Sequence, residues 1–310
     1  MAKGKAISFF GNGLGNMVML MPALAAMSTL TETGKIDIVL DDRWRDMRRP
    51  AVEEILFNWK VIDRVISWPR ETFDPREYDL WYYSGHGNGS CQIVDLFIQK
   101  LRYVVAKPSW RGSKMHESNH YMEVAYAQGY EGPVPEVNFP LADGPILDLP
   151  HPIIGICNGW FRGTKYWEKK GWPHFERLSS VLKMYFPGGA LVGVGLEGEL
   201  PTGTRLDADY GGKLTILQTA KVISQIDLLI TTDTGNMHIA DTLDVPLIAL
   251  FGPTLTTKNR PIGKRSHVLT ASMECVPCQD TRAFSSCEKA ICMEEIKPGD
   301  VMAVAREMLR

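Results

Sequence analysis

The chain begins the same local pattern twice, and each time a short apolar run leads through a loop into a helical stretch. In the first half the run is Lys5–Phe10, followed by a glycine loop at 11–15 and an apolar helical stretch over 16–30. In the second half Ile153–Cys157 starts a similar series. Strands that alternate with helical stretches favour parallel βαβ units. The sequence therefore predicts two α/β halves, each built on a parallel sheet.

A segment rich in proline, glycine and aspartate separates the two series. The residues LADGPILDLPHP at 141–152 have the composition of an interdomain linker. We therefore predict an N-terminal domain over 1–145 and a C-terminal domain over 150–310. Two α/β halves of comparable size imply a cleft between them, and such clefts are common ligand sites.

The remaining elements are expected from the same alternation of apolar and polar stretches. Strands are predicted at 35–40, 61–65, 78–83, 190–195, 227–231 and 246–251, and helices at 52–59, 172–185, 214–224, 235–243 and 300–309. Pro22 should either kink the first helix or lie near its first turns.

Bulk properties exclude several functional classes. The formal net charge is −2, so no global basic field attracts the chain to nucleic acid or to an anionic membrane. No apolar run reaches the ~18–20 residues that a membrane span needs. No signal-peptide cleavage site is evident either, so we expect a cytoplasmic protein that does not bind nucleic acid.

One motif in the second half has the form of an anion site. Asp233-Thr234-Gly235 follows a strand and opens a helix, whose first-turn amides have no internal partner and whose dipole adds partial positive charge. Gly235 lets a phosphate approach the backbone closely, Thr234 offers a hydroxyl, and Asp233 offers an acceptor or a cap. A plain helix cap is the alternative for an isolated Asp-Thr-Gly.

The longer segment DLLITTDTGNMHIADTLDVPLIALFGPT resembles the signature of glycosyltransferase family 9, the bacterial lipopolysaccharide heptosyltransferase family. The resemblance implies the GT-B fold, in which two Rossmann-like domains face each other across a cleft. It also implies an inverting transfer from a nucleotide-diphospho-sugar without a catalytic metal or other cofactor. ADP-heptose is the first donor to test, and a glycan or lipopolysaccharide-type acceptor at the inner face of the membrane is implied as well.

Further donor-site residues follow from the same resemblance. Lys170, just before Trp-Pro, resembles the lysine that contacts the donor phosphate in the family, although a solvated charge is the alternative. Glu197 resembles the acidic residue that binds the nucleoside, with Glu199 as the fallback because the register is uncertain. Asn158 ends the first strand of this half and is expected to reach the phosphates. His238, one turn into the anion-binding helix, is expected to contact ligand rather than serve as a core histidine.

The general base is the point where the sequence departs from the family, which usually carries Gly-Asp after the first glycine loop. Here Asn16 occupies that position, and an amide can only orient a hydroxyl by hydrogen bonding. Three alternatives stay open: another residue such as His86 or Asp42 supplies the base, the leaving phosphate takes the proton, or the protein binds sugar nucleotides without catalysis. Asn16 and His86 are therefore the catalytic candidates.

Four cysteines within eighteen residues form the second informative feature, with the pattern Cys275-x2-Cys278-x8-Cys287-x4-Cys292. Such a set suits a tetrahedral thiolate site for zinc or iron, with free thiols or a disulfide as alternatives. A metal there would be structural, because four thiolates leave no open coordination position.

A basic stretch in the first half could face an anionic or lipid-linked acceptor, although a solvated charged helix is the preferred explanation. It contains Arg43, Trp44, Arg45, Arg48 and Arg49. The sequence thus predicts an inverting glycosyltransferase. The alternatives are a catalytically silent nucleotide-sugar or glycan-binding protein and a sugar-nucleotide epimerase of the same architecture.

Overall fold

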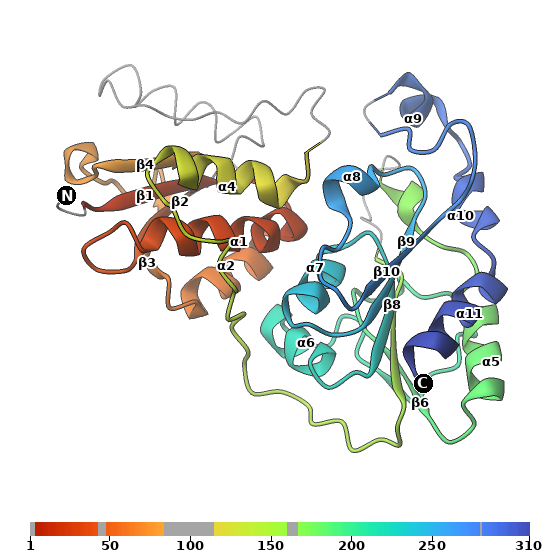
Figure 1. Cartoon of the computed structure of the whole chain (residues 1–310). Helices are drawn as coiled ribbons and strands as arrows, with labels where there is room; N and C mark the ends of the chain where they lie inside the picture. Colours follow the sequence, from red (N-terminus) through yellow and green to blue (C-terminus); the bar gives the residue numbers. More distant parts are fainter. Residues whose placement is uncertain (1–3, 43–47, 84–114, 160–166, 280) are drawn as a thin grey trace. The chain divides into compact units, whose positions relative to one another are not determined.

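The computed structural model describes residues 4–42, 48–83, 115–159, 167–279 and 281–310 (Figure 1). The chain divides into two compact units, Met1–Pro140 and Leu141–Arg310. Most of 141–152 has no regular structure, which agrees with its proline- and glycine-rich composition. None of the helices in the described part combines the length and apolarity that crossing a lipid bilayer requires.

The N-terminal unit contains a parallel sheet whose described strands follow the order β3-β2-β1-β4. These strands are β1 (Ala6–Phe10), β2 (Ile36–Asp41), β3 (Ile62–Trp68) and β4 (Leu80–Tyr83). Its helices are α1 (Leu14–Ser28), α2 (Arg49–Asn58) and α4 (Glu117–Ala127), with a short 3₁₀ turn, η1, at Pro75–Glu77.

Helix α1 has apolar residues on nearly all sides because it is packed between β-strands and α4, which lies beside it. Pro22 lies inside this helix, in its third turn. It therefore does not lie near the start of the helix, which was one of the two expected positions. The first helical turn of α1 and that of α4 carry the polar side chains discussed below.

The C-terminal unit contains a second parallel sheet of order β10-β9-β8-β5-β6-β7. The strands are β5 (Ile153–Cys157), β6 (Ala190–Gly193), β7 (Ala208–Asp209), β8 (Leu228–Thr232), β9 (Leu247–Phe251) and β10 (Ser266–Thr270). The helices are α5 (Phe175–Tyr185), α6 (Ile216–Ile223), α7 (Gly235–Thr242), α8 (Thr256–Asn259), α9 (Arg282–Ser286), α10 (Ile291–Glu295) and α11 (Pro298–Met308), and η2 is a 3₁₀ turn at Glu168–Lys170.

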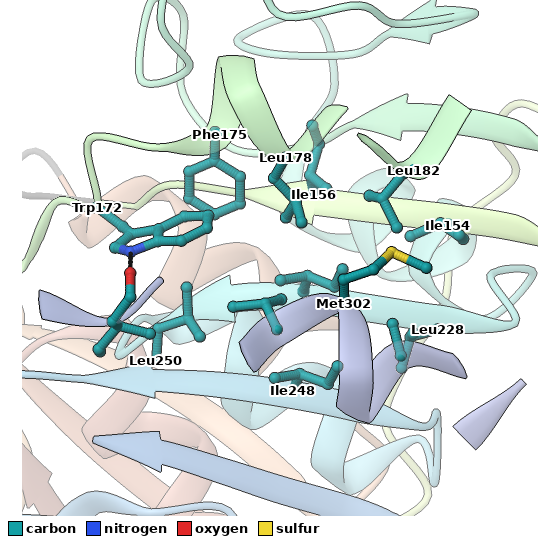
Figure 2. Packing of buried hydrophobic residues seen from close by; sticks show 14 of the residues in the cluster. Ile154, Ile156, Trp172, Phe175, Leu178, Leu182, Leu228, Ile248, Leu250 and Met302 are labelled. Carbon is teal, nitrogen blue, oxygen red and sulfur yellow. Dashed lines mark hydrogen bonds between the residues drawn. The ribbon is translucent and has the colours of Figure 1, made fainter. Parts of the chain in front are cut away.

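Helices cover both faces of this sheet: α5 pairs with α11, and α6 pairs with α7 (Figure 1). The core under α5 and α11 is built from branched aliphatic residues of β5, β8 and β9 together with two aromatic rings (Figure 2). Trp172 and Phe175 meet edge to face with ring centroids 4.9 Å apart, and the Trp172 indole donates to the carbonyl of Ile296 at 2.9 Å. This core fixes the chain immediately after Lys170.

Candidate functional site

The order of strands in the C-terminal sheet marks one place as suited to a ligand. Strand β5 lies between β6 and β8, and the chain proceeds from β5 to β6 on one side and returns to β8 on the other. In open parallel sheets, ligands bind outside the carboxyl ends of the strands at such a switch point. Asn158 follows β5 there, and Asp233 follows β8.

The start of α7 is capped by Thr234, whose extended backbone precedes the first helical residue. Its hydroxyl oxygen accepts from the amide of Met237 at 3.4 Å. Of the two roles expected for Asp233, acceptor or cap, the cap therefore belongs to Thr234. The partial positive charge of the helix end adds to any cation placed beside it.

Lys170 supplies that cation. Its Nζ lies 3.2 Å from a carboxylate oxygen of Asp233, and the two side chains are 18% and 7% exposed. The same ammonium group lies 5.3 Å from the ring centroid of Trp167. An ammonium with one carboxylate partner retains donors for a second anion, since it carries three N–H groups.

Asn158 connects three loops at this edge of the sheet. Its side-chain oxygen accepts from the amide of Trp172 at 2.7 Å, and its amide nitrogen donates to the carbonyl of Glu199 at 3.2 Å. The residue is 5% exposed. Both polar side-chain atoms are engaged within the protein, so the side chain fixes the segment that carries Lys170.

Gly159 packs directly against the capping residue of α7. A β-carbon at Gly159 would lie 2.3 Å from Cγ2 of Thr234, and the Gly159 carbonyl accepts from the Thr232 hydroxyl at 2.9 Å. The short, branched threonine cannot move aside as a long flexible side chain could. Glycine is therefore required here by close approach.

We expect Gly159→Ala to lower the free energy of unfolding by about 1–3 kcal/mol, the usual cost of overpacking. Gly188→Ala is the matched control, because a β-carbon there meets no atom within 4 Å. Equal behaviour of the two variants would contradict this account of the helix start.

The two glutamates after β6 differ in environment. Glu197 is exposed, whereas Glu199 is 6% exposed and its carboxylate accepts from the amide of Leu196 at 2.8 Å. Gly195 adopts φ +127° in this loop, which only glycine tolerates without strain. Glu199 therefore shapes the loop, and Glu197 is the carboxylate presented to solvent.

His238 and Asn236 lie in the first turn of α7. His238 is 5% exposed, and its carbonyl accepts from Thr242. Asn236 donates to the thiol of Cys157 at 3.4 Å. Burial raises the pKa of the Cys157 thiol to about 11, so this cysteine remains protonated at neutral pH. It serves as packing at the end of β5 rather than as a nucleophile.

The N-terminal unit has a second polar cluster at the start of α1. Asn16, half-buried, donates through its side-chain nitrogen to the carboxylate of Glu117 and to the Tyr121 hydroxyl, the latter at 3.4 Å. Glu117 is 6% exposed. A β-carbon at Gly13 would lie 2.5 Å from the Arg48 guanidinium and 3.6 Å from the Asn16 side-chain oxygen. The glycine loop thus brings Arg48 close to Asn16.

Glu117 and Tyr121 were not among the predicted site residues. They lie 101 and 105 residues from Asn16, so no local spacing connects them to it. The local sequence feature that could have drawn attention to Glu117 is its position as an acidic residue in the first turn of α4, directly after the capping His116.

Of the other candidate bases, Asp42 lies in an ion-pair network. Arg70 and Arg49 both donate to its carboxylate, the latter at 2.8 Å, and these bonds, that of Arg70 foremost, hold the pKa of Asp42 below its usual value. Arg49 also donates to Glu53 at 2.7 Å. His86, like Arg43, Trp44 and Arg45, lies outside the described residues.

Four of the five cysteines in the C-terminal unit, Cys275, Cys278, Cys287 and Cys292, are close enough to influence one another electrostatically. Burial foremost, with added repulsion from the neighbouring thiolates, raises the pKa of Cys292 to about 11 and also raises that of Cys278. Cys287 contacts the Lys289 carbonyl at 3.0 Å, and Cys275 is exposed. Four thiols are a suitable donor set for a tetrahedral ion, but the described residues include no group of three or more ligands placed to hold one.

Two parallel α/β units, each with polar groups at the carboxyl ends of its strands, define the GT-B class of fold. Solved structures agree with this class. A glycosyl transferase family 9 protein from Veillonella parvula has a TM-score of 0.73 at 15% identity, with 99% of this chain and 97% of that chain covered. The E. coli ADP-heptose lps heptosyltransferase II has a TM-score of 0.69 at 17% identity, with 98% of each chain covered.

The family model of glycosyltransferase family 9 (heptosyltransferase) matches residues 93–287, which is more than half of the chain. The chain therefore belongs to glycosyltransferase family 9. Among curated relatives, the lipooligosaccharide heptosyltransferase 2 of Haemophilus influenzae is 26% identical over 129 residues, which are 38% of this chain and 36% of that protein. Across such relatives the matched part spans 30–57% of their length.

Proposed function

We propose that the chain is an inverting glycosyltransferase that takes a sugar, heptose as first choice, from a nucleotide-diphosphate donor such as ADP-heptose. The acceptor is a glycan of lipopolysaccharide type, presented at the cytoplasmic face of a membrane. The observation that carries the proposal is the Lys170 ammonium group 3.2 Å from Asp233, beside the start of α7. Family membership and the ADP-heptose named for the E. coli structural relative support this choice of donor.

The C-terminal unit, in this proposal, holds the donor diphosphate. Negative charge develops on the leaving phosphate as the bond to the anomeric carbon breaks, and fixed positive dipoles and cations stabilise it. Lys170 supplies the cation, and the amides at Gly235 supply the dipoles. Thr234 holds the helix start in place, and His238 lies in the same turn.

Two further residues complete the donor site. The exposed carboxylate of Glu197 is suited to accept hydrogen bonds from ribose hydroxyls. Asn158 acts by fixing the loop before α5, since its side chain already bonds to Trp172 and Glu199. Residues 150–310 are thus proposed as the donor domain and residues 1–145 as the acceptor domain, with Asn16 in the acceptor site. None of these roles needs a metal.

A catalytically silent sugar-nucleotide or glycan-binding protein is the second candidate, because Asn16 has no useful basicity. Donor turnover separates the two. The experiment measures ADP release from ADP-heptose with a panel of lipopolysaccharide cores truncated before their heptoses. Acceptor-dependent ADP release supports the transferase. Donor binding in calorimetry without ADP release on any acceptor favours the binding protein.

A structural zinc or iron ion at Cys275, Cys278, Cys287 and Cys292 is a separate proposal, supported by the close spacing of these four cysteines in the sequence. Because no step of the transfer is assigned to the ion, its removal should lower stability more than turnover. We expect elemental analysis of purified protein to give about one ion per chain, since four thiolates complete one tetrahedral shell. Metal-free protein with unchanged thermal stability would contradict this part.

A further inference from the structure

Sugar transfer to a hydroxyl requires a group that accepts the hydroxyl proton, and such a base typically contributes ~10²–10⁴-fold to the rate. Asn16 cannot do so. Asp42 is bound by Arg49 and Arg70, which lower its pKa and therefore its basicity. Among the described residues, we therefore looked for a carboxylate at the carboxyl end of β1, next to Asn16.

Glu117 is such a carboxylate. It begins α4, is 6% exposed, and accepts the side-chain N–H of Asn16. In the N-terminal sheet β1 lies between β2 and β4, so the loop after β1 lies at the switch point of that sheet. Asn16 therefore links Glu117 to the place where a ligand of this unit is expected.

Glu117 is a buried carboxylate, and the hydrogen bond from Asn16 offsets part of the cost of burying its charge. A carboxylate has two oxygens with about four acceptor positions. A carboxylate that accepts from Asn16 can therefore also accept from a hydroxyl. Asn16 in turn keeps its side-chain oxygen, close to Gly13, to align the same hydroxyl.

We propose that Glu117 is the catalytic base of this transferase and that Asn16 aligns both Glu117 and the acceptor. This inference rests on the proposed function. The acceptor O–H bond breaks and its proton moves to Glu117, while the oxygen forms the new bond to the anomeric carbon. The bond from that carbon to the diphosphate breaks, and its electron pair leaves with the phosphate oxygen. Water then takes the proton from Glu117.

Ionisable groups near Glu117 lie on its own helix and beside Asn16. Tyr121 is buried, which raises its pKa well above the usual value, with a further contribution from the Glu117 charge, so it stays protonated. His116 directly precedes Glu117, and its ring nitrogen accepts from the Ser118 amide. The Arg48 guanidinium lies close to Asn16, beside Gly13.

The main test is Glu117→Gln, which keeps the shape and removes the charge. We expect kcat for ADP-heptose and truncated lipopolysaccharide core to fall ~10²–10⁴-fold, with ADP affinity and melting temperature close to wild type. Glu123→Gln is the matched control, because this carboxylate lies on the same helix and its side chain is 54% exposed. It should keep wild-type kcat.

A pH profile separates a base from a structural hydrogen bond. In the wild-type protein log(kcat/KM) should fall at low pH, because only the deprotonated base accepts the hydroxyl proton. In Glu117→Gln this acidic limb should disappear. Moving the carboxylate back with Asn16→Asp/Glu117→Gln should restore both the limb and turnover to within about tenfold of wild type.

The outcomes distinguish this inference from the proposed function. Suppose that the wild-type protein turns over and that Glu117→Gln keeps full kcat and the acidic limb of the pH profile. This result overturns the role of Glu117 but not the proposed transferase activity. A wild-type protein that releases no ADP on any acceptor overturns the transferase, and the role of Glu117 with it. Loss of kcat and of the acidic limb in a folded, ADP-binding Glu117→Gln variant supports both.

Discussion

Lys170→Met should weaken ADP binding about 100-fold, since a hydrogen bond to a charged group contributes about 1.5–3 kcal/mol and 1.4 kcal/mol is tenfold. The ammonium group lies beside the start of α7, and methionine keeps most of the side-chain volume without the charge. The loss has a second source, because the Asp233 carboxylate then faces the diphosphate without its partner. Calorimetric titration with ADP measures the effect.

The matched control is Lys169→Met. Lys169 neighbours Lys170 in the chain, but its ammonium donates to the carbonyl of Phe284 and lies 5.0 Å from the centre of that ring. We expect ADP affinity in this variant to stay within about threefold of wild type, as for other charges held away from the ligand. An equal loss of ADP affinity in both lysine variants would contradict a specific contact at Lys170, because it would show that any nearby positive charge has the same effect.

The variant Lys170→Met/Asp233→Asn separates ligand binding from protein stability. Removing one partner of a buried ion pair costs about 3–5 kcal/mol, and here about 1–3 kcal/mol is expected because Lys170 is partly exposed. Removing both charges should recover most of this stability. ADP affinity should not recover, because the cation is still missing. Recovery of ADP affinity in the double variant would contradict the proposed role of Lys170.

Trp172→Ala should lower the free energy of unfolding of the C-terminal unit by about 3–5 kcal/mol, the range for truncating a large buried aromatic. The indole is fully buried, packs against Phe175 (Figure 2) and donates to the Ile296 carbonyl. The melting temperature should fall by roughly 6–20 °C. Because Trp172 anchors the chain two residues after Lys170, ADP affinity should fall as well.

Two variants calibrate this result. Trp172→Phe retains an aromatic ring but loses the hydrogen bond and part of the volume, so about 2 kcal/mol is expected. Met184→Ala lies on α5 with 69% of its residue surface exposed and should change stability by less than about 0.5 kcal/mol. A small effect of Trp172→Ala, close to that of Met184→Ala, would refute the assigned core.

Much of the C-terminal half could be predicted because its signals are local. The strand Ile153–Cys157 was predicted with the bounds that the structure has. The strand predicted at 227–231 is shifted by one residue in the structure, and the strand predicted at 246–251 begins one residue later. The predicted helix at 172–185 begins later, at Phe175. The Trp172 side chain packs in the core, and its backbone amide donates to Asn158 instead of entering the helix. Strand β10 was not predicted, since its residues Ser266–Thr270 are only partly apolar and form one edge of the sheet.

The site itself was harder to predict than the fold. Sequence reasoning identified Lys170 and Asp233 separately, but their pairing depends on two loops 63 positions apart in the chain, so no spacing rule reveals it. The Asn16–Glu117 hydrogen bond is longer-range still. The expected roles of the site residues and the cleft between the two domains stay predictions.

Strand order has a consequence for how the protein is made. In the C-terminal sheet Ile154 of β5 pairs with Leu228 of β8, and synthesis completes β6 and β7 before β8 is available. One edge of β5 therefore stays unpaired until the ribosome has synthesised the intervening helices and β8. Pairings between strands that are far apart in the sequence form slowly. The nascent chain acquires the neighbourhood of Asp233 only when this edge is closed, so binding competence comes late in its biogenesis.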